Sequence, residues 1–306
     1  MQNIIRVFPR KTKATPDDCL AFTGLPPMQE TAGYKQLTLD CLNIAGDKMP
    51  DWRESKIVHV SVAFTYDIPR AEQLAEGWHK AGFSVQMGGS AFNMPGGDFM
   101  PGMYLKKGYV ITSRGCNKSC WHCSVHTREG GLRELPIQPG WNIVDDNFLA
   151  CSETHIRNVF EMLKTQPKKP IFTGGLDSTL LREWHVDLLR TAKVERMYFA
   201  YDSPSDLEPL IHAGKLLRAG GIKNTSGSRA KCYVLIGYPG DTMEQAEKRL
   251  LDTWRAGFFP YAMLFRDEKG ETNKDWRVFQ RVWVRPQIVH SKLKAVRVPW
   301  QKLTCI

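Results

Sequence analysis

The sequence predicts an α/β protein in which a small N-terminal domain precedes a longer series of alternating strands and helices. Apolar runs rich in β-branched residues alternate with helical stretches along most of the 306 residues. Several helical stretches begin at Ser, Asp or Thr, and some end at Gly. Hydrophobic residues make up 42% of the chain, which is enough to fill a core.

The N-terminal part has the pattern of a β-α-β unit. Ile57–Phe64 is an apolar run typical of a strand, Pro69–Gly82 has helical spacing between a Pro and a Gly, and Phe83–Gly89 is a second strand candidate. This order predicts a small open, Rossmann-like α/β sheet. Met94–Gly102 contains Pro and Gly residues that interrupt regular structure. We therefore expect an N-terminal domain over residues 1–104.

Six strand candidates follow in the second domain. They are Tyr109–Thr112, Asn142–Val144, Ile171–Thr173, Met197–Tyr201, Cys232–Ile236 and Tyr261–Phe265. Helices are predicted between them at Ser152–Lys164, Ser178–Ala192, Asp206–Gly220 and Thr242–Gly257. Six β/α units in a row imply a parallel sheet whose functional face lies at the carboxyl ends of the strands. This domain is expected over residues 105–285, followed by a basic C-terminal extension over 286–306.

One helical face near the C-terminus is aromatic and the opposite face is basic. The aromatic residues recur at i, i+3 and i+7, and they are Trp276, Phe279 and Trp283. The cations recur at i, i+4 and i+8, and they are Arg277, Arg281 and Arg285. This pattern predicts a helix that packs on the domain through its aromatic residues and turns its cations outward, toward phosphate.

The formal charge of +10 is unevenly distributed. Residues 1–16 contain four Lys or Arg and no acid, residues 271–306 contain eight Lys or Arg against two acids, and the remainder is neutral. Two basic ends favour a polyanionic partner such as a nucleic acid or nucleotide. The alternative is a solvated surface that aids solubility.

The chain has no apolar stretch of about 18 residues, the length that a membrane helix needs. Its start lacks the apolar block of a secretory signal. We therefore expect no membrane association and a cytoplasmic location. Five of the cysteines are scattered singly and are expected to be buried thiols: Cys19, Cys41, Cys151, Cys232 and Cys305.

The other three cysteines lie on one loop, directly after the first strand of the second domain. Cys116, Cys120 and Cys123 have the spacing C-x3-C-x2-C. Three thiolates can bind three irons of a cubic 4Fe-4S cluster and leave the fourth iron without a protein ligand. Zinc is the competing metal, because His126 would complete a Cys3His site. A group of structural thiols is the third interpretation.

This cysteine spacing, after a strand and at the start of a β/α series, resembles the radical S-adenosylmethionine (SAM) enzymes. The resemblance covers roughly residues 105–285 and implies a partial (β/α)6 barrel. It also implies an activity: the open iron binds SAM, one electron cleaves the bond from sulfur to C5′, and the resulting 5′-deoxyadenosyl radical takes a hydrogen atom from the substrate. A reductant such as a flavodoxin or ferredoxin would supply the electron.

Further segments extend the resemblance to residues that contact SAM. "IFTGG" is similar to the family's glycine motif after the third strand, which implies that Gly174 and Gly175 hold the methionine amine. Leu176 follows where the family often has an acid, so Asp177 or the backbone must supply any polar contact there. "FAYDS" implies that Asp202 and Ser203 contact the ribose and the methionine carboxylate.

The adenine contacts are implied in the same way. "YVLIGYPGDT" is similar to the family's segment at the fifth strand, so Ile236, Gly237 and Tyr238 are expected against adenine. The residue before the third cysteine is usually aromatic and packs near adenine, and here it is His122.

Candidate substrate residues follow several of the strands. They are Asp145, Asp146 and Asn147 after the second strand, Tyr201 at the end of the fourth, and Arg266 after the sixth. All five are predicted to face the active end of the partial barrel, and the alternative for each is ordinary loop capping.

The N-terminal domain is similar to the cobalamin-binding domain that some family members carry. "NIVDDNFLAC" resembles a segment common in those members, but no D-x-H-x-x-G stretch offers an axial histidine. We therefore do not expect cobalamin, and we expect a degenerate domain that serves as a lid or docking surface.

Together, the resemblance and the two basic ends imply a radical SAM enzyme that modifies or rearranges a nucleic-acid base or nucleotide. The alternatives are radical modification of a peptide or a small metabolite, methylation or methylthiolation, and a noncatalytic zinc-binding module.

Overall fold

The computed structural model describes residues 4–10, 57–92, 105, 107–222, 224, 229–267 and 269–295. The chain divides into two compact units. The smaller unit runs to Tyr109 and also contains Cys120–Gly130, whereas the larger unit contains Val110–Ser119 and the chain from Gly131 onward. The predicted domain boundary at Met94–Gly102 lies outside the described residues, as do Cys19, Cys41 and Cys305.

The smaller unit contains a three-stranded parallel sheet in the order β1-β2-β3. Its strands are β1 (Ile4–Val7), β2 (Ile57–Ser61) and β3 (Ser84–Gly88), and α2 (Ile68–Lys80) connects the last two. The predicted β-α-β unit is therefore confirmed. Strand β1 was not predicted, because four residues next to several cations give little strand signal. The unit also contains the short helices η1 (Thr65–Asp67), η2 (Ser90–Phe92) and α3 (Val125–Arg128).

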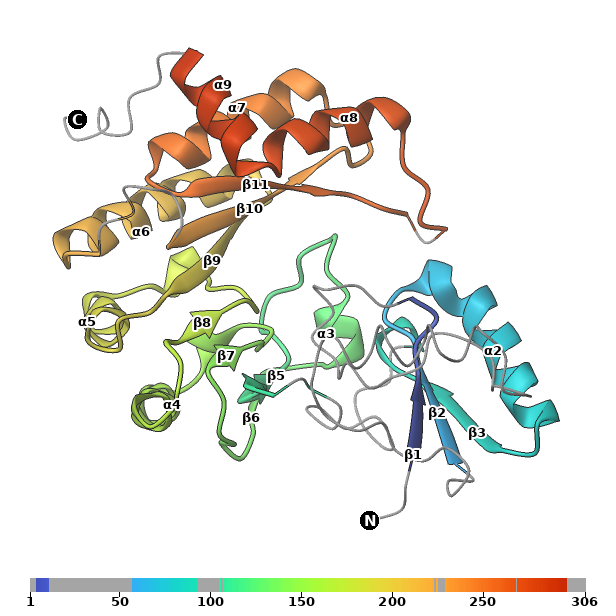
Figure 1. Ribbon diagram of the computed structural model, residues 1–306. Helices are drawn as coiled ribbons and strands as arrows, with labels where there is room; N and C mark the ends of the chain where they lie inside the picture. Colours follow the sequence, from blue (N-terminus) through green and yellow to red (C-terminus); the bar gives the residue numbers. More distant parts are fainter. Residues whose placement is uncertain are drawn as a thin grey trace. The chain divides into compact units, whose positions relative to one another are not determined.

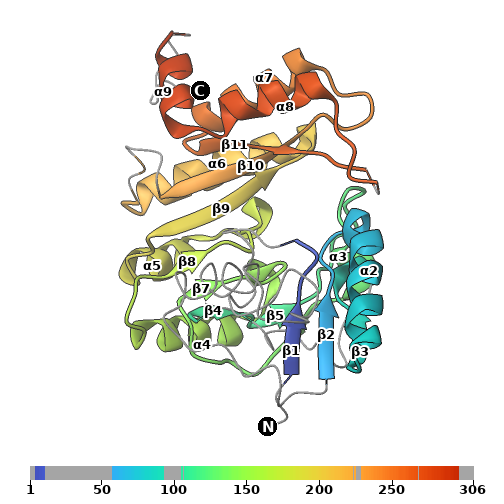
Figure 2. The ribbon, with the colours of Figure 1, turned by 45° about the vertical axis from the view of Figure 1, so that its right-hand side comes forward.

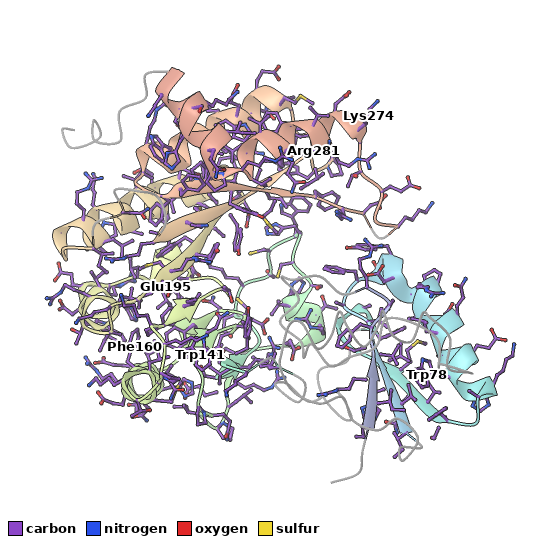
Figure 3. The ribbon with its side chains drawn as sticks, in the orientation of Figure 1. Trp78, Trp141, Phe160, Glu195, Lys274 and Arg281 are labelled. Carbon is purple, nitrogen blue, oxygen red and sulfur yellow. The ribbon has the colours of Figure 1, made fainter. Side chains whose placement is uncertain are left out.

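The core of the smaller unit lies between this sheet and α2. Ala71, Leu74 and Trp78 recur on one face of the helix and are fully buried, as are Val58 and Val60 from β2. Trp78 (Figure 3) meets the Phe83 ring edge to face, with 5.1 Å between the ring centroids. Burial of a side chain of this size contributes on the order of 2–3 kcal/mol. The unit therefore has a hydrophobic core of its own.

The larger unit contains a six-stranded sheet in the order β11-β10-β9-β8-β7-β4. Its strands are β4 (Tyr109–Val110), β7 (Asn142–Ile143), β8 (Ile171–Phe172), β9 (Arg196–Tyr201), β10 (Ala230–Ile236) and β11 (Phe259–Leu264). Every pairing from β7 to β11 is parallel. The predicted α/β class with a parallel sheet is thus confirmed, and the carboxyl ends of these strands lie along one edge.

Helices connect consecutive strands of this sheet. They are α4 (Glu153–Lys164), α5 (Glu183–Thr191), α6 (Leu207–Ala219) and α7 (Met243–Arg255), and α8 (Lys274–Trp283) and α9 (Pro286–Ala295) follow the last strand. Figure 1 shows α4, α5 and α7 along the outer side of the sheet. Successive helices from α5 to α9 contact each other, and α7 and α8 both pack on β11, as Figure 2 shows from a second direction.

Helix α4 shows why the sequence folds this way locally. The Ser152 side chain accepts a hydrogen bond from the amide of His155 (3.2 Å) and so caps the first turn. Ile156, Val159 and Phe160 lie on the buried face, and Phe160 joins an aromatic cluster with Phe148 and Phe172. The short 3-10 helix η4 (Phe148–Ala150) brings Phe148 into this cluster.

The prediction of one helix over Ser178–Ala192 was wrong. The structure has a 3-10 turn, η5 (Ser178–Leu180), then extended residues, then α5. The Asp177 side chain accepts from the amide of Thr179 (3.0 Å) and caps the start of this turn, and the backbone becomes extended at Leu181. Helix α5 begins anew after Arg182, whose amide donates to Nδ1 of His185 (3.0 Å).

One further segment differs from the sequence prediction. The strand predicted over Tyr109–Thr112 ends at Val110, and Ser113–Arg114 forms β5, which pairs antiparallel with β6 (Arg133–Glu134). By contrast, the helix predicted over Asp206–Gly220 is confirmed as α6, with Asp206 as its N-cap residue, and the 3-10 turn η6 (Pro204–Asp206) precedes it. Across the described ranges, no helix combines the length and apolar character needed to span a bilayer.

Candidate functional site

Asp145 anchors the loop that leads to the first cysteine. Its side chain is buried and accepts hydrogen bonds from the amide of Thr112 (2.6 Å), from Oγ1 of Thr112 (2.5 Å) and from Oγ of Ser113 (2.8 Å). Burial raises the pKa of Asp145, and these hydrogen bonds oppose the rise. Asp145 was predicted to face the substrate. Its carboxylate instead uses its acceptor positions for hydrogen bonds to Thr112 and Ser113, at the start of the cysteine loop.

The next two residues continue this anchoring. Asp146 accepts from the amide of Gly115 (3.0 Å) and forms an ion pair with Arg114 (3.2 Å). The amide group of Asn147 donates from Nδ2 to Sγ of Cys116 (3.3 Å). Three consecutive residues after β7 thus fix successive steps of the chain that leads to Cys116.

The sulfur of Cys116 accepts two hydrogen bonds. The donors are Asn147 and the amide of Lys118 (3.4 Å). Asn147 is buried, and its Oδ1 has no hydrogen-bond partner within the described ranges. Hydrogen bonds of this kind to the sulfurs of iron–sulfur centres help to set the reduction potentials of those centres.

An ion pair ties the cysteine loop to the segment after β8. Nζ of Lys118 lies 2.7 Å from Oδ2 of Asp177, whose side chain is 9% exposed. Burial alone raises the pKa of Asp177, but the hydrogen bonds from Lys118 and Thr179 and the Lys118 charge outweigh it, so the net pKa is lowered. Asp177 is therefore ionised at neutral pH and acts as a loop anchor.

The described cysteines fall into two groups by exposure. Cys116, Cys120 and Cys123 are accessible, whereas Cys151 and Cys232 are buried. Burial raises the pKa of Cys151 to about 11 and also raises that of Cys232, so these two thiols stay protonated and unreactive. The prediction that they are buried thiols is confirmed, and the loop cysteines are those available as ligands.

The two compact units share the cysteine loop. Cys116 belongs to the larger unit, and Cys120 and Cys123 belong to the smaller one, where the amide of Cys123 donates to the carbonyl of Cys120 (3.0 Å). In the same stretch, the His122 ring contacts the exposed ring of Trp121, with 5.2 Å between centroids. Among the residues that the structure describes, no group of three or more His, Cys, Asp or Glu side chains could hold a metal ion.

The backbone requires glycine at both predicted positions after β8. A Cβ atom at Gly174 would collide with the backbone oxygen of Asp145. Gly175 has φ +101°, a left-handed conformation that disfavours other residues. The chain after β8 therefore passes directly against the chain after β7, and Gly174 leaves its own backbone exposed at this edge.

The two predicted polar residues after β9 have structural partners. Oδ1 of Asp202 accepts from the amide of Leu235 (3.1 Å) and so links the ends of β9 and β10. The Ser203 amide donates to Oδ2 of Asp206 (2.8 Å) in the turn before α6. Both side chains are half-buried at the carboxyl edge of the sheet.

The turn after β10 is built on a buried ion pair that the sequence analysis missed. Gly237 has φ +72°, and its amide donates to Oδ2 of Asp241 (2.8 Å). The same oxygen accepts from Nη2 of Arg249 (2.7 Å), which also donates to the carbonyl of Leu235 (3.0 Å). Arg249 also lies over the Tyr238 ring, 5.2 Å from its centroid. The sequence did contain a signal for this ion pair, since Arg249 is a cation among the buried residues of α7.

The remaining predicted site residues differ in exposure. Ile236 is fully buried in the core of the larger unit. Tyr201 is also buried, and burial raises its pKa to about 12, so its hydroxyl is neutral. Arg266 follows β11 and is exposed. Of these three, only Arg266 presents a polar side chain to solvent.

The carboxyl edge of the sheet thus brings together the loops after β7, β8, β9 and β10 with the first cysteine. Such an edge offers a cysteine sulfur, exposed backbone and ordered turns, and small polar ligands commonly bind at the carboxyl ends of parallel strands. No protein-family model matches the chain, and no curated protein sequence shows significant similarity to it.

Proposed function

We propose that this chain is a radical SAM enzyme that binds a 4Fe-4S cluster through Cys116, Cys120 and Cys123. The main support is the C-x3-C-x2-C loop, which follows the first strand of a sheet whose six strands are ordered as in the chain. The same order supports the finer proposal of a partial (β/α)6 barrel. When bound, the cluster supplies one electron to SAM, which is cleaved to a 5′-deoxyadenosyl radical.

The three cysteines supply the ligand type that such a cluster takes, and binding the cluster would draw their sulfurs together, because the described residues form no metal-binding group in this structure. Cys116 receives two N–H donors, and all three loop cysteines are accessible. Asn147, Asp146 and Asp145 would act as positioning residues, because each holds part of the chain around Cys116. Three cysteine ligands would leave one iron open for SAM.

The other edge residues would orient SAM. The exposed backbone at Gly174 would receive its methionine amine, Asp202 and Ser203 would lie toward its ribose and carboxylate, and the turn at Gly237 and Tyr238 would lie against its adenine. The Asp241–Arg249 pair would keep that turn in shape through its bond to the Gly237 amide. Exclusion of water and correct orientation are the protein's part of such chemistry.

We propose a nucleic-acid base or nucleotide as the substrate. The basic C-terminal part of the chain supports this class, since its cations outnumber its acids by eight to two. The basic residues at the N-terminus give this substrate class less support, because one of them, Arg10, already forms an ion pair with Asp67 (3.0 Å). A base within a duplex would have to be flipped out or met single-stranded. A flavodoxin or ferredoxin is proposed as the electron donor.

Metal analysis after anaerobic purification tests the proposal. We expect about four irons and four sulfides per chain, and formation of 5′-deoxyadenosine when SAM and dithionite are added. Cys120→Ser should lose the iron and the cleavage activity. Cys151→Ala is the matched control, because it removes a thiol that is buried outside the loop.

The same measurement separates the alternatives. One zinc per chain without iron or sulfide would contradict the proposal and identify a zinc-binding module. Iron bound equally by the wild type and by Cys120→Ser would show that the loop does not hold the cluster.

A further inference from the structure

Helix α8 has an apolar face and an exposed basic face. Trp283 is fully buried, and Trp276 and Phe279 pack against the core of the larger unit. On the opposite face, the exposed residues include Lys274 and Arg281, both labelled in Figure 3. Arg277 is also exposed, and Arg285 is exposed in the link that follows the end of α8 at Trp283. The structure therefore confirms the two predicted faces over α8, but Arg285 does not continue the basic face because the helix has ended.

Among the described residues, the cations of this face, like Lys215 and Arg218 of α6, lack the acidic partners that α4, α5 and α7 provide. On α4, α5 and α7, every Lys and Arg forms an ion pair with an acid: Arg157, Lys164, Arg190, Lys248, Arg249 and Arg255. Within the described ranges, Lys274, Arg277, Arg281 and Arg285 form no ion pair with any Asp or Glu. The one acid on α8 is Asp275, in its first turn. The basic face thus presents uncompensated charge.

The start of α8 lies beside the carboxyl edge of the sheet. A Cβ atom at Gly237, in the turn after β10, would lie 3.0 Å from Cδ2 of Trp276. Lys274 and Arg277 are neighbours of Trp276 on the same first turns of the helix. The basic face therefore begins next to the candidate site and runs away from it along α8.

We propose that the exposed face of α8 binds the phosphate backbone of a nucleic-acid substrate. Arg277 and Arg281 are four residues apart on α8, which spaces their Cα atoms about 6 Å along the helix axis, and Arg285 follows just after the end of the helix. Uncompensated guanidinium groups in such a row complement a row of phosphates, which they contact without reading sequence. The proposal rests on the proposed function only for the class of substrate, and its test needs no turnover.

Fluorescence anisotropy with the full-length, anaerobically purified protein tests this surface. The probes are a labelled mixed-sequence single-stranded DNA, its duplex and the equivalent RNA. We expect the triple variant Arg277→Gln, Arg281→Gln, Arg285→Gln to weaken binding at least tenfold at about 50 mM salt. For the duplex, the slope of log K against log salt should become shallower by about 2 to 3, because each lost phosphate contact removes about 0.9.

The matched control is the triple variant Arg157→Gln, Lys164→Gln, Arg190→Gln. It removes the same charge from α4 and α5, where each cation already has an acidic partner. Binding by this variant should stay within about twofold of the wild type. Circular dichroism and iron content, equal in all three proteins, would show that the fold and the proposed cluster are intact.

Three outcomes would overturn the proposal. Equal weakening by both triple variants would mean that net charge alone determines binding. Unchanged binding by the α8 variant would place the nucleic acid elsewhere. Failure of every nucleic-acid probe, together with Arg281-dependent binding of an acidic flavodoxin, would make the face a protein-docking surface. A protein that binds iron and cleaves SAM in any of these cases would leave the proposed radical chemistry standing.

Discussion

At the residue scale, buried carboxylates organise the loops of the larger unit. Asp145, Asp146 and Asp241 each accept a backbone N–H group from a loop at the carboxyl edge of the sheet. A carboxylate that accepts several donors replaces the hydrogen bonds that the loop would otherwise make with water. These acids therefore shape the candidate site by holding its backbone.

The hydrogen bond from Asn147 to Cys116 gives a prediction for the proposed cluster. Asn147→Leu keeps a similar volume and removes the N–H donor, so the more negative reduced cluster loses stabilisation. The reduction potential should fall while iron content and Tm stay near those of the wild type. A redox titration followed by electron paramagnetic resonance measures the potential.

Thr173→Val is the control for this titration. It removes a hydrogen bond at the same edge of the sheet, from Thr173 Oγ1 to Asn142 Oδ1 (2.8 Å), without touching a sulfur. A potential that does not move in Asn147→Leu, at equal iron content, would rule out a tuning role for Asn147.

The Asp241–Arg249 pair gives a prediction for stability. The Asp241 side chain is 0% exposed and that of Arg249 is 8% exposed, so the loss of one partner leaves a buried charge uncompensated. Arg249→Met should lower the free energy of unfolding by about 3–5 kcal/mol. Urea denaturation measures this loss.

The double variant Asp241→Asn, Arg249→Met should recover much of the lost free energy of unfolding. This variant removes both charges and keeps an acceptor for the Gly237 amide. A double variant as unstable as the single one would show that packing of the Arg249 side chain, and not its charge, supports the turn.

At the element scale, the start of α5 contains a buried neutral histidine. Nδ1 of His185 accepts from the Arg182 amide, and the ring is 4% exposed. Burial, assisted by the nearby Arg182 charge, lowers the pKa of His185 from 6.5 to about 4. The folded state therefore disfavours a proton that the unfolded chain accepts.

This pKa shift predicts how stability depends on pH. Above pH 6.5 the ring is neutral in both states, and below it the unfolded chain gains protons first. The free energy of unfolding should fall by up to about 1.4 kcal/mol for each pH unit between 6.5 and 4. His185→Gln keeps an acceptor at this position and should flatten the dependence. Urea midpoints across this range compare the two proteins, and parallel curves would contradict the role of His185.

At the scale of the whole molecule, each compact unit has its own hydrophobic core. Trp78 and the buried valines of β2 form one core, whereas the aromatic cluster around Phe160 belongs to the other. The surface charge is also unevenly distributed, because α4, α5 and α7 pair their cations and α8 does not. The basic face of α8 therefore carries part of the net charge of +10, in a form that can attract a polyanion.

Local patterns predicted much of this fold. The apolar runs located the strands β7 to β11 within about two residues, and Ser152 and Thr242 cap α4 and α7 as expected. These signals are local, since they depend on side-chain periodicity and on hydrogen bonds between near neighbours. Strand β1 was not predicted, because its strand conformation depends on pairing with the distant strand β2. In that pairing Ile5 lies opposite Val58.

The sequence by itself determined the α/β class, the alternation of strands and helices along the chain, and the position of three cysteines after the first strand of the larger unit. Tertiary structure alone decided that Asp145 and Asp146 hold the loop before Cys116, that Asn147 donates to its sulfur, and that Arg249 supports the turn at Gly237. Periodicity reports which face of an element is buried. It does not report which distant polar group satisfies a buried donor or acceptor, because that partner is chosen only when the strands lie side by side.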